Sequence, residues 1–116
     1  MGKSEGGIKV RRDDILEFAN VIVNGSREAS YGDPKDSFGR IARLWSAVVG
    51  KDLIPSDVAL MLVLLKVSRL VNDRSNLDSW IDLCGYASLG GELSFDGESL
   101  MNQMFAHIFE EDEKDG

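Results

Sequence analysis

Two neighbouring apolar stretches decide the fold: VALMLVLLKVSRL at residues 58–70 and LDSWIDLCGYASL at residues 77–89. The first holds eight consecutive apolar residues, and both carry apolar side chains at helical spacing. The short polar segment NDRSN, residues 72–76, separates them. This pattern predicts two linked helices, each with most of its surface facing the core.

Four charged residues interrupt these apolar helices. Lys66 and Arg69 lie three residues apart in the first helix, and Asp78 and Asp82 lie four apart in the second. Each pair therefore projects from one side of its helix. Because a charged side chain is rarely buried unless it is paired or holds a ligand, the four residues predict either an interhelical salt-bridge set or a charged pocket.

The composition is that of one domain that can fold alone. A chain of 116 residues buries about two-thirds of the surface that its unfolded form exposes, enough for a core without metal or disulfides. The single cysteine, Cys84, lies within the second apolar helix, where a thiol packs as a small hydrophobe, and this favours a reducing compartment. A formal net charge of −7 argues against duplex nucleic acid as the main ligand, because phosphate binding uses clustered Lys and Arg.

The sequence shows neither a membrane span nor a secretory signal. The longest apolar run is far shorter than the ~20 residues that a membrane-spanning helix requires. Residues 1–14, MGKSEGGIKVRRDD, lack the apolar segment of a signal peptide. We therefore expect a cytoplasmic protein that does not bind membranes.

The whole chain is expected to be all-α. No stretch alternates with the period of a strand, and apolar residues recur at three- and four-residue spacing. The expected helices run from about Arg12 to Asn24, Phe38 to Val49, Pro55 to about Val71, Leu77 to Leu89, and Glu98 to Phe109. The expected organisation is a flexible arm at 1–10, a helical core domain at 11–92, a connector and C-terminal helix at 93–109, and an acidic disordered tail at 110–116.

The loop SREASYGDPKDS, residues 26–37, precedes the second helix. Gly32 and Pro34 are expected to keep it out of regular helix. Asp33 or Asp36 is expected to cap the helix that follows.

Small and polar residues also mark the helix over residues 77–89. Ser75 or Asn76 is expected to cap its start, and Gly90-Gly91 to end it. Gly85 lies inside the helix, where glycine costs about 1 kcal/mol relative to alanine. It therefore predicts either a close contact with another helix or room for a ligand.

Three motifs in combination resemble a known type of protein. They are the segment SREASYGDPKDSFGRIARLWS, a proline-led helix that ends in KVSRL, and the segment DSWIDLCGYASLGGE. Over about residues 12–92 they resemble a small phage-encoded helical family of unknown function. They are also similar, more distantly, to the MazG-like all-α nucleotide pyrophosphohydrolases and to helical nucleotide-modification-associated domains of phages. The resemblance implies a four-helix MazG-like bundle, to which residues 98–109 add a fifth, C-terminal amphipathic helix.

The resemblance also favours a nucleotide or a nucleotide-derived signal as the ligand. The cationic side chains would contact its phosphates, and the ring of Tyr31 would stack on its base beside the close-approaching backbone of Gly32. The alternative is that Tyr31 and Gly32 form a turn in which the ring packs against the protein. The expected ligand-binding residues are Arg27, Tyr31, Gly32, Lys66, Arg69 and Tyr86.

MazG-like enzymes use Mg²⁺ held by carboxylates, and Asp78 and Asp82 are the candidate metal ligands, with Glu17 as a third. The sequence departs from that family here. The acidic stretch at residues 13–17 has the spacing of the family's first acidic motif but lies much further before Asp78 than in the family. Asp78 and Asp82 are four apart, whereas the family's second motif has a spacing of three.

Three functions remain open at this point. The first is a phage protein of the host cytoplasm that captures a nucleotide or a nucleotide-derived signal without turnover, as an anti-defence sponge would. The second is a Mg²⁺-dependent MazG-like nucleoside triphosphate pyrophosphohydrolase. The third is a helical interaction protein that docks a host partner. Four short helices leave an apolar face uncovered, and the resemblance implies pockets completed across subunits, as in MazG-like domains. A homodimer or a dimer of dimers is therefore expected.

Overall fold

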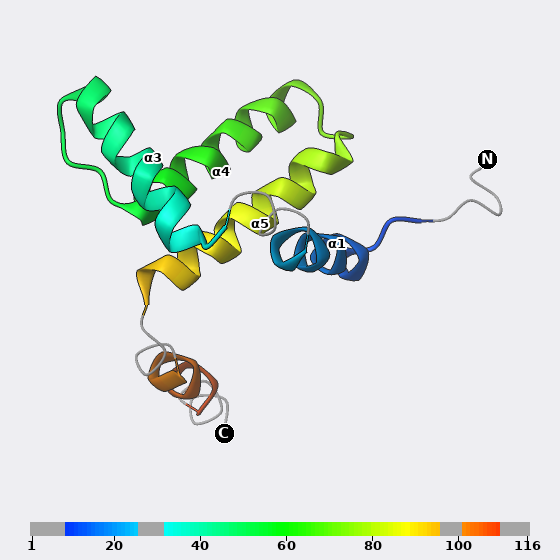
Figure 1. The fold of residues 1–116 in the computed structure, drawn as a ribbon. Helices are drawn as coiled ribbons and strands as arrows, with labels where there is room; N and C mark the ends of the chain where they lie inside the picture. Colours follow the sequence, from blue (N-terminus) through cyan, green and yellow to red (C-terminus); the bar gives the residue numbers. More distant parts are fainter. Residues whose placement is uncertain (1–8, 26–31, 96–100, 110–116) are drawn as a thin grey trace.

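The computed structural model describes residues 9–25, 32–95 and 101–109, and every regular element in these ranges is a helix (Figure 1). The all-α class is therefore confirmed for this part of the chain. None of its helices is long and apolar enough to cross a membrane. The helices are α1 (Arg12–Asn24), α3 (Pro34–Val49), α4 (Pro55–Asn72), α5 (Leu77–Ser94) and a further helix over residues 101–109.

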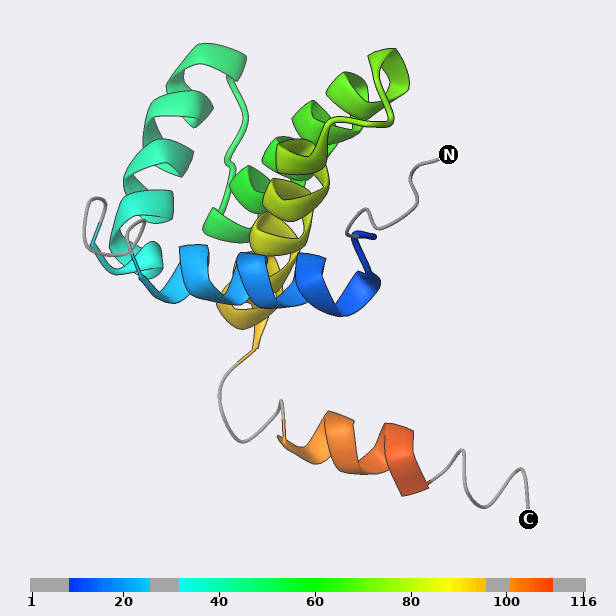
Figure 2. The same ribbon diagram turned by 90° about the vertical axis from the view of Figure 1, so that its right-hand side faces the viewer.

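The centre of the fold is an antiparallel hairpin of α4 and α5. These two helices make the most extensive contact in the structure. α1 packs on α5 and crosses it at a steep angle in Figure 2, whereas α3 packs mainly on α4. Thus α1 flanks the α5 side of the hairpin, and α3 flanks the α4 side.

The N-terminus of α3 lies further upstream than the sequence predicted. The helix starts at Pro34 instead of Phe38, because Asp33 acts as N-cap and its Oδ1 accepts a hydrogen bond from the backbone N–H of Lys35 at 3.0 Å. Proline is well tolerated in the first helical position, which needs no backbone N–H. Gly32 just before the cap has φ +81°, in the left-handed region that glycine adopts without strain.

The turn between α4 and α5 is closed by side chains. Asn76 is the N-cap of α5, as one of the two predicted candidates, and its Oδ1 accepts the N–H of Ser79 at 3.1 Å. The hydroxyl and the N–H of Ser75 both donate to the Asp73 carboxylate, and these hydrogen bonds lower the pKa of Asp73. These hydrogen bonds therefore hold the turn in the conformation that brings α4 and α5 together.

The prediction that Gly90-Gly91 ends the second hairpin helix is wrong, because α5 continues through both glycines to Ser94. A Cβ at Gly90 would lie 3.0 Å from the Cβ of Ala59 on α4. Gly85 has the same role toward α1, where an added Cβ would lie 3.2 Å from Val23 Cγ2. The close-contact interpretation of Gly85 is thus confirmed, and α5 presents one glycine to α1 and another to α4.

The core is small and lies where α3, α4 and α5 meet. Val58 and Ala59 are almost fully buried there. Partly buried apolar side chains from all four labelled helices surround this cluster. The buried members are Phe38, Ala42, Val58, Ala59 and Leu89.

Ser79, in the first turn of α5, is a buried polar residue. It is 1% exposed, and its hydroxyl oxygen has no hydrogen-bond partner within the described part of the chain. A buried hydroxyl without a partner lowers stability. The hairpin therefore contains one polar group that packing alone does not explain.

The remaining predicted segments fall partly outside the described residues. Most of the expected arm, residues 1–8, and the acidic tail, residues 110–116, lie outside, as do Glu98 to Leu100. Residues 101–109 are helical as expected, and all are exposed. Leu93 and Ser94, expected in a connector, belong to α5.

Replacing adjacent glycines of α5 tests the close approach to α4. Gly91→Ala should raise the free energy of unfolding by about 0.5 to 1 kcal/mol, because alanine favours helix and nothing lies within 4 Å of its Cβ. The free energy of unfolding of Gly90→Ala should be at least about 1 kcal/mol lower than that of Gly91→Ala. Its methyl group would lie too close to the Cβ of Ala59, and an alanine side chain cannot rotate out of the way. Equal stability of the two variants in urea denaturation would exclude a contact of this closeness.

A second substitution tests the unpartnered hydroxyl in the hairpin. Ser79→Ala should leave the free energy of unfolding unchanged or raise it by about 1 kcal/mol, because it removes an unsatisfied buried hydroxyl. Thermal and urea denaturation measure this. A loss of more than about 1 kcal/mol would mean that the hydroxyl is hydrogen-bonded in the folded protein.

Candidate functional site

The hairpin brings two of the four predicted charges into direct contact. Lys66 Nζ on α4 lies 3.0 Å from Asp82 Oδ2 on α5, and the two side chains are only 12% and 17% exposed. The alignment of α4 and α5 that places Lys66 opposite Asp82 also places Ala59 opposite Gly90, two turns along the hairpin. The close helix packing thus places an ion pair between two apolar helices.

The other two predicted charges are on the surface near the turn. Arg69 is exposed in the last turn of α4, and Asp78 is exposed in the first turn of α5. Each has the sign that its helix terminus favours, a cation at the C-terminus and an anion at the N-terminus. We call these four residues, Lys66, Arg69, Asp78 and Asp82, the charged seam; it passes from a nearly buried ion pair to exposed charges.

Tyr86 and Ser79 flank the ion pair along α5. Tyr86 follows Asp82 by one turn, is half-buried and packs against the core cluster. Ser79 precedes Asp82 by three residues and carries the unpartnered hydroxyl. Polar groups therefore occupy three successive turns of α5 at or near its contact with α4.

The other predicted ligand-binding residues are not brought to this seam by the described structure. Arg27 and Tyr31 lie outside the described residues. Gly32 is exposed at the start of α3 and has the left-handed backbone noted above. Nothing lies within 4 Å of a Cβ added at Gly32.

The predicted carboxylate site for Mg²⁺ is also incomplete. Within the described ranges, no group of three or more His, Cys, Asp or Glu side chains is close enough to hold a metal ion. Asp82 already contacts Lys66 through Oδ2. Glu17, the predicted third ligand, is exposed on α1, so the described residues do not fit a site of the MazG type.

Two clefts along α5 were not predicted. The first, of about 300 Å³, lies between α4 and α5, where the small side chains of α5 leave room beside Tyr86. Its lining residues are Ser56, Ala59, Leu60, Val63, Tyr86, Ala87, Gly90, Gly91 and Ser94. The pair Gly90-Gly91 was the signal in the sequence, but it was interpreted as a helix end.

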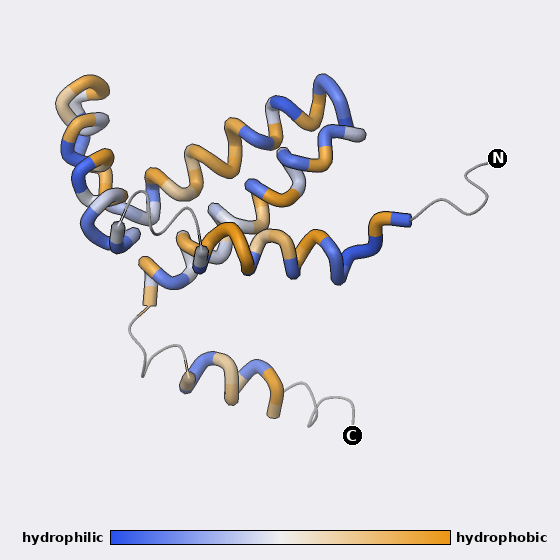
Figure 3. Tube along the Cα trace, turned by 45° about the vertical axis from the view of Figure 1, so that its right-hand side comes forward, coloured by the Kyte–Doolittle hydropathy of each residue, from blue (hydrophilic) through white to orange (hydrophobic). Residues whose placement is uncertain are grey.

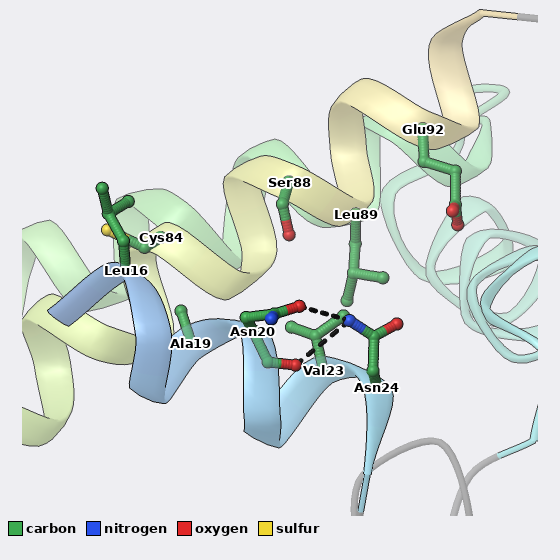
Figure 4. A pocket seen from close by; sticks show the side chains of 9 residues that line it. All are labelled: Leu16, Ala19, Asn20, Val23, Asn24, Cys84, Ser88, Leu89 and Glu92. Carbon is green, nitrogen blue, oxygen red and sulfur yellow. Dashed lines mark hydrogen bonds between the residues drawn. The ribbon is translucent and has the colours of Figure 1, made fainter. Parts of the chain in front are cut away.

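The second cleft, of about 290 Å³, lies between α1 and α5 (Figure 4). Asn24 Nδ2 donates to Asn20 Oδ1 at 2.7 Å along its α1 wall. Cys84 and Glu92 line the opposite wall. The amphipathic pattern of α1 gave no indication of this asparagine pair.

Comparison with known proteins identifies the type of chain. The "Gene 55 protein" of Mycobacterium phage L5 is 42% identical over 76 residues, which cover 65% of this chain and 49% of that protein. The "Gene 55 protein" of Mycobacterium phage D29 is 36% identical over 75 residues, 65% of this chain and 50% of that protein. This chain therefore spans about half the length of these two relatives.

No protein of solved structure gives a significant match. The matched relatives confirm the resemblance to phage proteins. A family model matches residues 14–94, a range that contains α1, α3, α4 and α5 almost entirely. The chain belongs to the family described as "Domain of unknown function (DUF6378)".

Proposed function

We propose that this protein binds a nucleotide or a nucleotide-derived signal at the charged seam and does not turn it over. The observation that carries the proposal is the nearly buried ion pair of Lys66 and Asp82 between two apolar helices. A buried ion pair contributes little net stability, because the loss of hydration offsets the attraction of the charges. Apolar residues would hold the hairpin at least as well, so the pair indicates a role beyond packing.

The surroundings of the pair support an anionic ligand. Arg69 lies three residues after Lys66, on the neighbouring turn of α4, and its exposed guanidinium can bind a phosphate with two hydrogen bonds. Asp82 holds the Lys66 ammonium in place between the two helices. A phosphate that approaches from the Arg69 side would meet one exposed and one oriented cation.

Tyr86 and the unpartnered hydroxyl of Ser79 support the same location. Tyr86 lines the cleft between α4 and α5, where an aromatic ring can pack against a base. The hydroxyl of Ser79 can donate to a ligand oxygen if the hairpin opens locally. Arg27 and Tyr31, which belong to the segment joining α1 to α3, complete the proposed set.

Binding is proposed in preference to hydrolysis. Metal-assisted phosphoryl chemistry needs carboxylates arranged around Mg²⁺, and the described residues offer no group of three candidate ligands. The similarity to MazG-like enzymes contributes only the class of ligand to this proposal. Use as an anti-defence sponge would follow from the same binding without turnover.

The first test separates packing from ligand binding at the ion pair. Lys66→Met alone should lower the free energy of unfolding by about 2 to 4 kcal/mol, because it removes the ammonium group that Asp82 contacts while the carboxylate stays largely shielded from water. The double variant Lys66→Met with Asp82→Leu should return to within about 1 kcal/mol of wild type. A double variant as unstable as the single one in urea denaturation would show that the pair itself holds the hairpin together.

The second test measures ligand binding with a matched control. Thermal shift and calorimetry with a panel of nucleoside triphosphates and cyclic dinucleotides, with and without Mg²⁺, should find one that stabilises the wild-type protein; at 100 times its Kd the gain is about 2.7 kcal/mol. Arg69→Met should weaken binding by at least about tenfold, a loss of ~1.4 kcal/mol. Arg43→Met, an exposed arginine on α3, should bind as wild type does.

Two results would count against the proposal. One is that no nucleotide at millimolar concentration stabilises the protein, or that Arg69→Met and Arg43→Met behave alike. The other is Mg²⁺-dependent release of pyrophosphate from a nucleoside triphosphate that Asp82→Asn abolishes, which would favour the hydrolase.

A further inference from the structure

The cleft between α1 and α5, which the proposed nucleotide site does not use, changes character along its length. Figure 4 shows Leu16 and Cys84 at one end, and Asn24 and Glu92 at the other. Between them the buried side chain of Leu89 points from α5 toward α1. Cys84 and Glu92 are eight residues apart, which is about 12 Å along a helix axis. The cleft therefore has an apolar end and a polar end within the length of a small molecule.

The polar end presents mainly hydrogen-bond acceptors. Asn24 Nδ2 donates to Asn20 Oδ1 at 2.7 Å and to the Asn20 backbone oxygen at 3.1 Å, so both of its hydrogens are used. The Ser88 hydroxyl donates to the Gly85 carbonyl at 2.7 Å and leaves only its lone pairs for a ligand. Within the described part of the chain, Asn24 Oδ1 and the exposed Glu92 carboxylate accept no hydrogen bond.

The charge of the cleft has the opposite sign to that of a phosphate site. None of the described residues that line it is Lys or Arg, and Glu92 adds a negative charge. Carboxylate, carbonyl and hydroxyl oxygens bind hydrogen-bond donors, and they bind cationic donors most strongly. The chain's net charge of −7 also attracts cations to its surface. A nucleotide phosphate would be repelled here.

Packing alone does not explain this choice of residues. A helix face that only packed against α5 would carry apolar residues at the positions of Asn20 and Asn24. The hydrogen bonds between these two asparagines satisfy their own groups, but they give no role to Glu92 on the opposite wall. The two walls together match a ligand that donates hydrogen bonds.

We propose that this cleft binds a small organic cation, an ammonium or guanidinium group on a short apolar chain. The charged head would lie between Glu92 and Asn24 Oδ1, and the chain would run past Leu89 toward Leu16 and Cys84. A volume of about 290 Å³ is at the lower limit of the ~300–1,000 Å³ typical of ligand pockets, which restricts the ligand to a small molecule or a single side chain. The proposal goes beyond nucleotide binding and does not depend on it.

Alkylation of Cys84 tests occupancy of the cleft directly. Cys84 is the only cysteine in the chain, is half-buried and lines the cleft, so iodoacetamide labels this site alone. The probe n-butylguanidinium should slow the labelling saturably, with a Kd on the order of 1 mM for so small a ligand. Its neutral isostere n-butylurea should not slow it at the same concentration. Ionic strength is held constant, because salt screens exposed charges.

Matched variants test the roles of the polar groups. Glu92→Gln should weaken protection of Cys84 at least about tenfold, because it removes the charged acceptor. Asn24→Leu keeps the net charge but removes the amide acceptor, and it should also weaken protection. Asp52→Asn is the control, since Asp52 is exposed between α3 and α4 and its replacement removes the same charge outside the cleft. It should behave as wild type does, and circular dichroism shows whether each variant keeps its helices.

A further probe distinguishes two sources of the cation. N-acetylarginine methylamide carries a guanidinium on a peptide-like backbone. Protection equal to that by n-butylguanidinium would support a partner protein's arginine as the occupant. Protection at least about tenfold weaker would support a free small molecule, because the cleft would then reject the attached backbone.

Four results would overturn the proposal. Equal protection by n-butylurea and n-butylguanidinium would show that the cleft selects apolar bulk and not charge. Equal loss in Glu92→Gln and Asp52→Asn would reduce the effect to general attraction of cations. No protection by the cation at ~20 mM, well above the expected Kd, would exclude the site, and stronger protection by a nucleoside triphosphate would assign the cleft to an anion. The measurement involves no residue of the charged seam, so this proposal and nucleotide binding can fail separately.

Discussion

The close approach of α4 and α5 at Gly90 is the constraint on which the rest of the structure depends. With no side chain at Gly90, Ala59 lies against the backbone of α5, and this contact sets the register of the hairpin. The same register places Lys66 opposite Asp82 and leaves the cleft beside Tyr86. Packing, ion pair and cleft are thus three consequences of one helix alignment.

The existence and type of the helices could be predicted, because apolar spacing reflects burial directly. The starts of α1, α4 and α5 were predicted well, since Pro55 and Asn76 act locally. The ends that depend on tertiary contacts were not. Gly90-Gly91 has the local signature of a helix end, and only the position of Ala59 explains why the helix continues through it.

The candidate site was predicted in part. Spacing alone identified the charges on each helix, but it could not say which would pair, because that depends on the relative shift of the two helices. The structure joins Lys66 to Asp82 and leaves Arg69 and Asp78 at the surface. The clefts along α5 could not be predicted, because they form between helices whose crossing no local pattern specifies.

The attachment of α1 has a consequence for the way this molecule moves. Among the labelled helices α1 contacts only α5, and Ala19 is its only buried residue among those described. Segments with so little buried surface open locally well below the free energy of global unfolding. α1 is therefore a separate opening unit, whose departure would expose the flank of α5 that carries Gly85 and Cys84 while the hairpin stays folded.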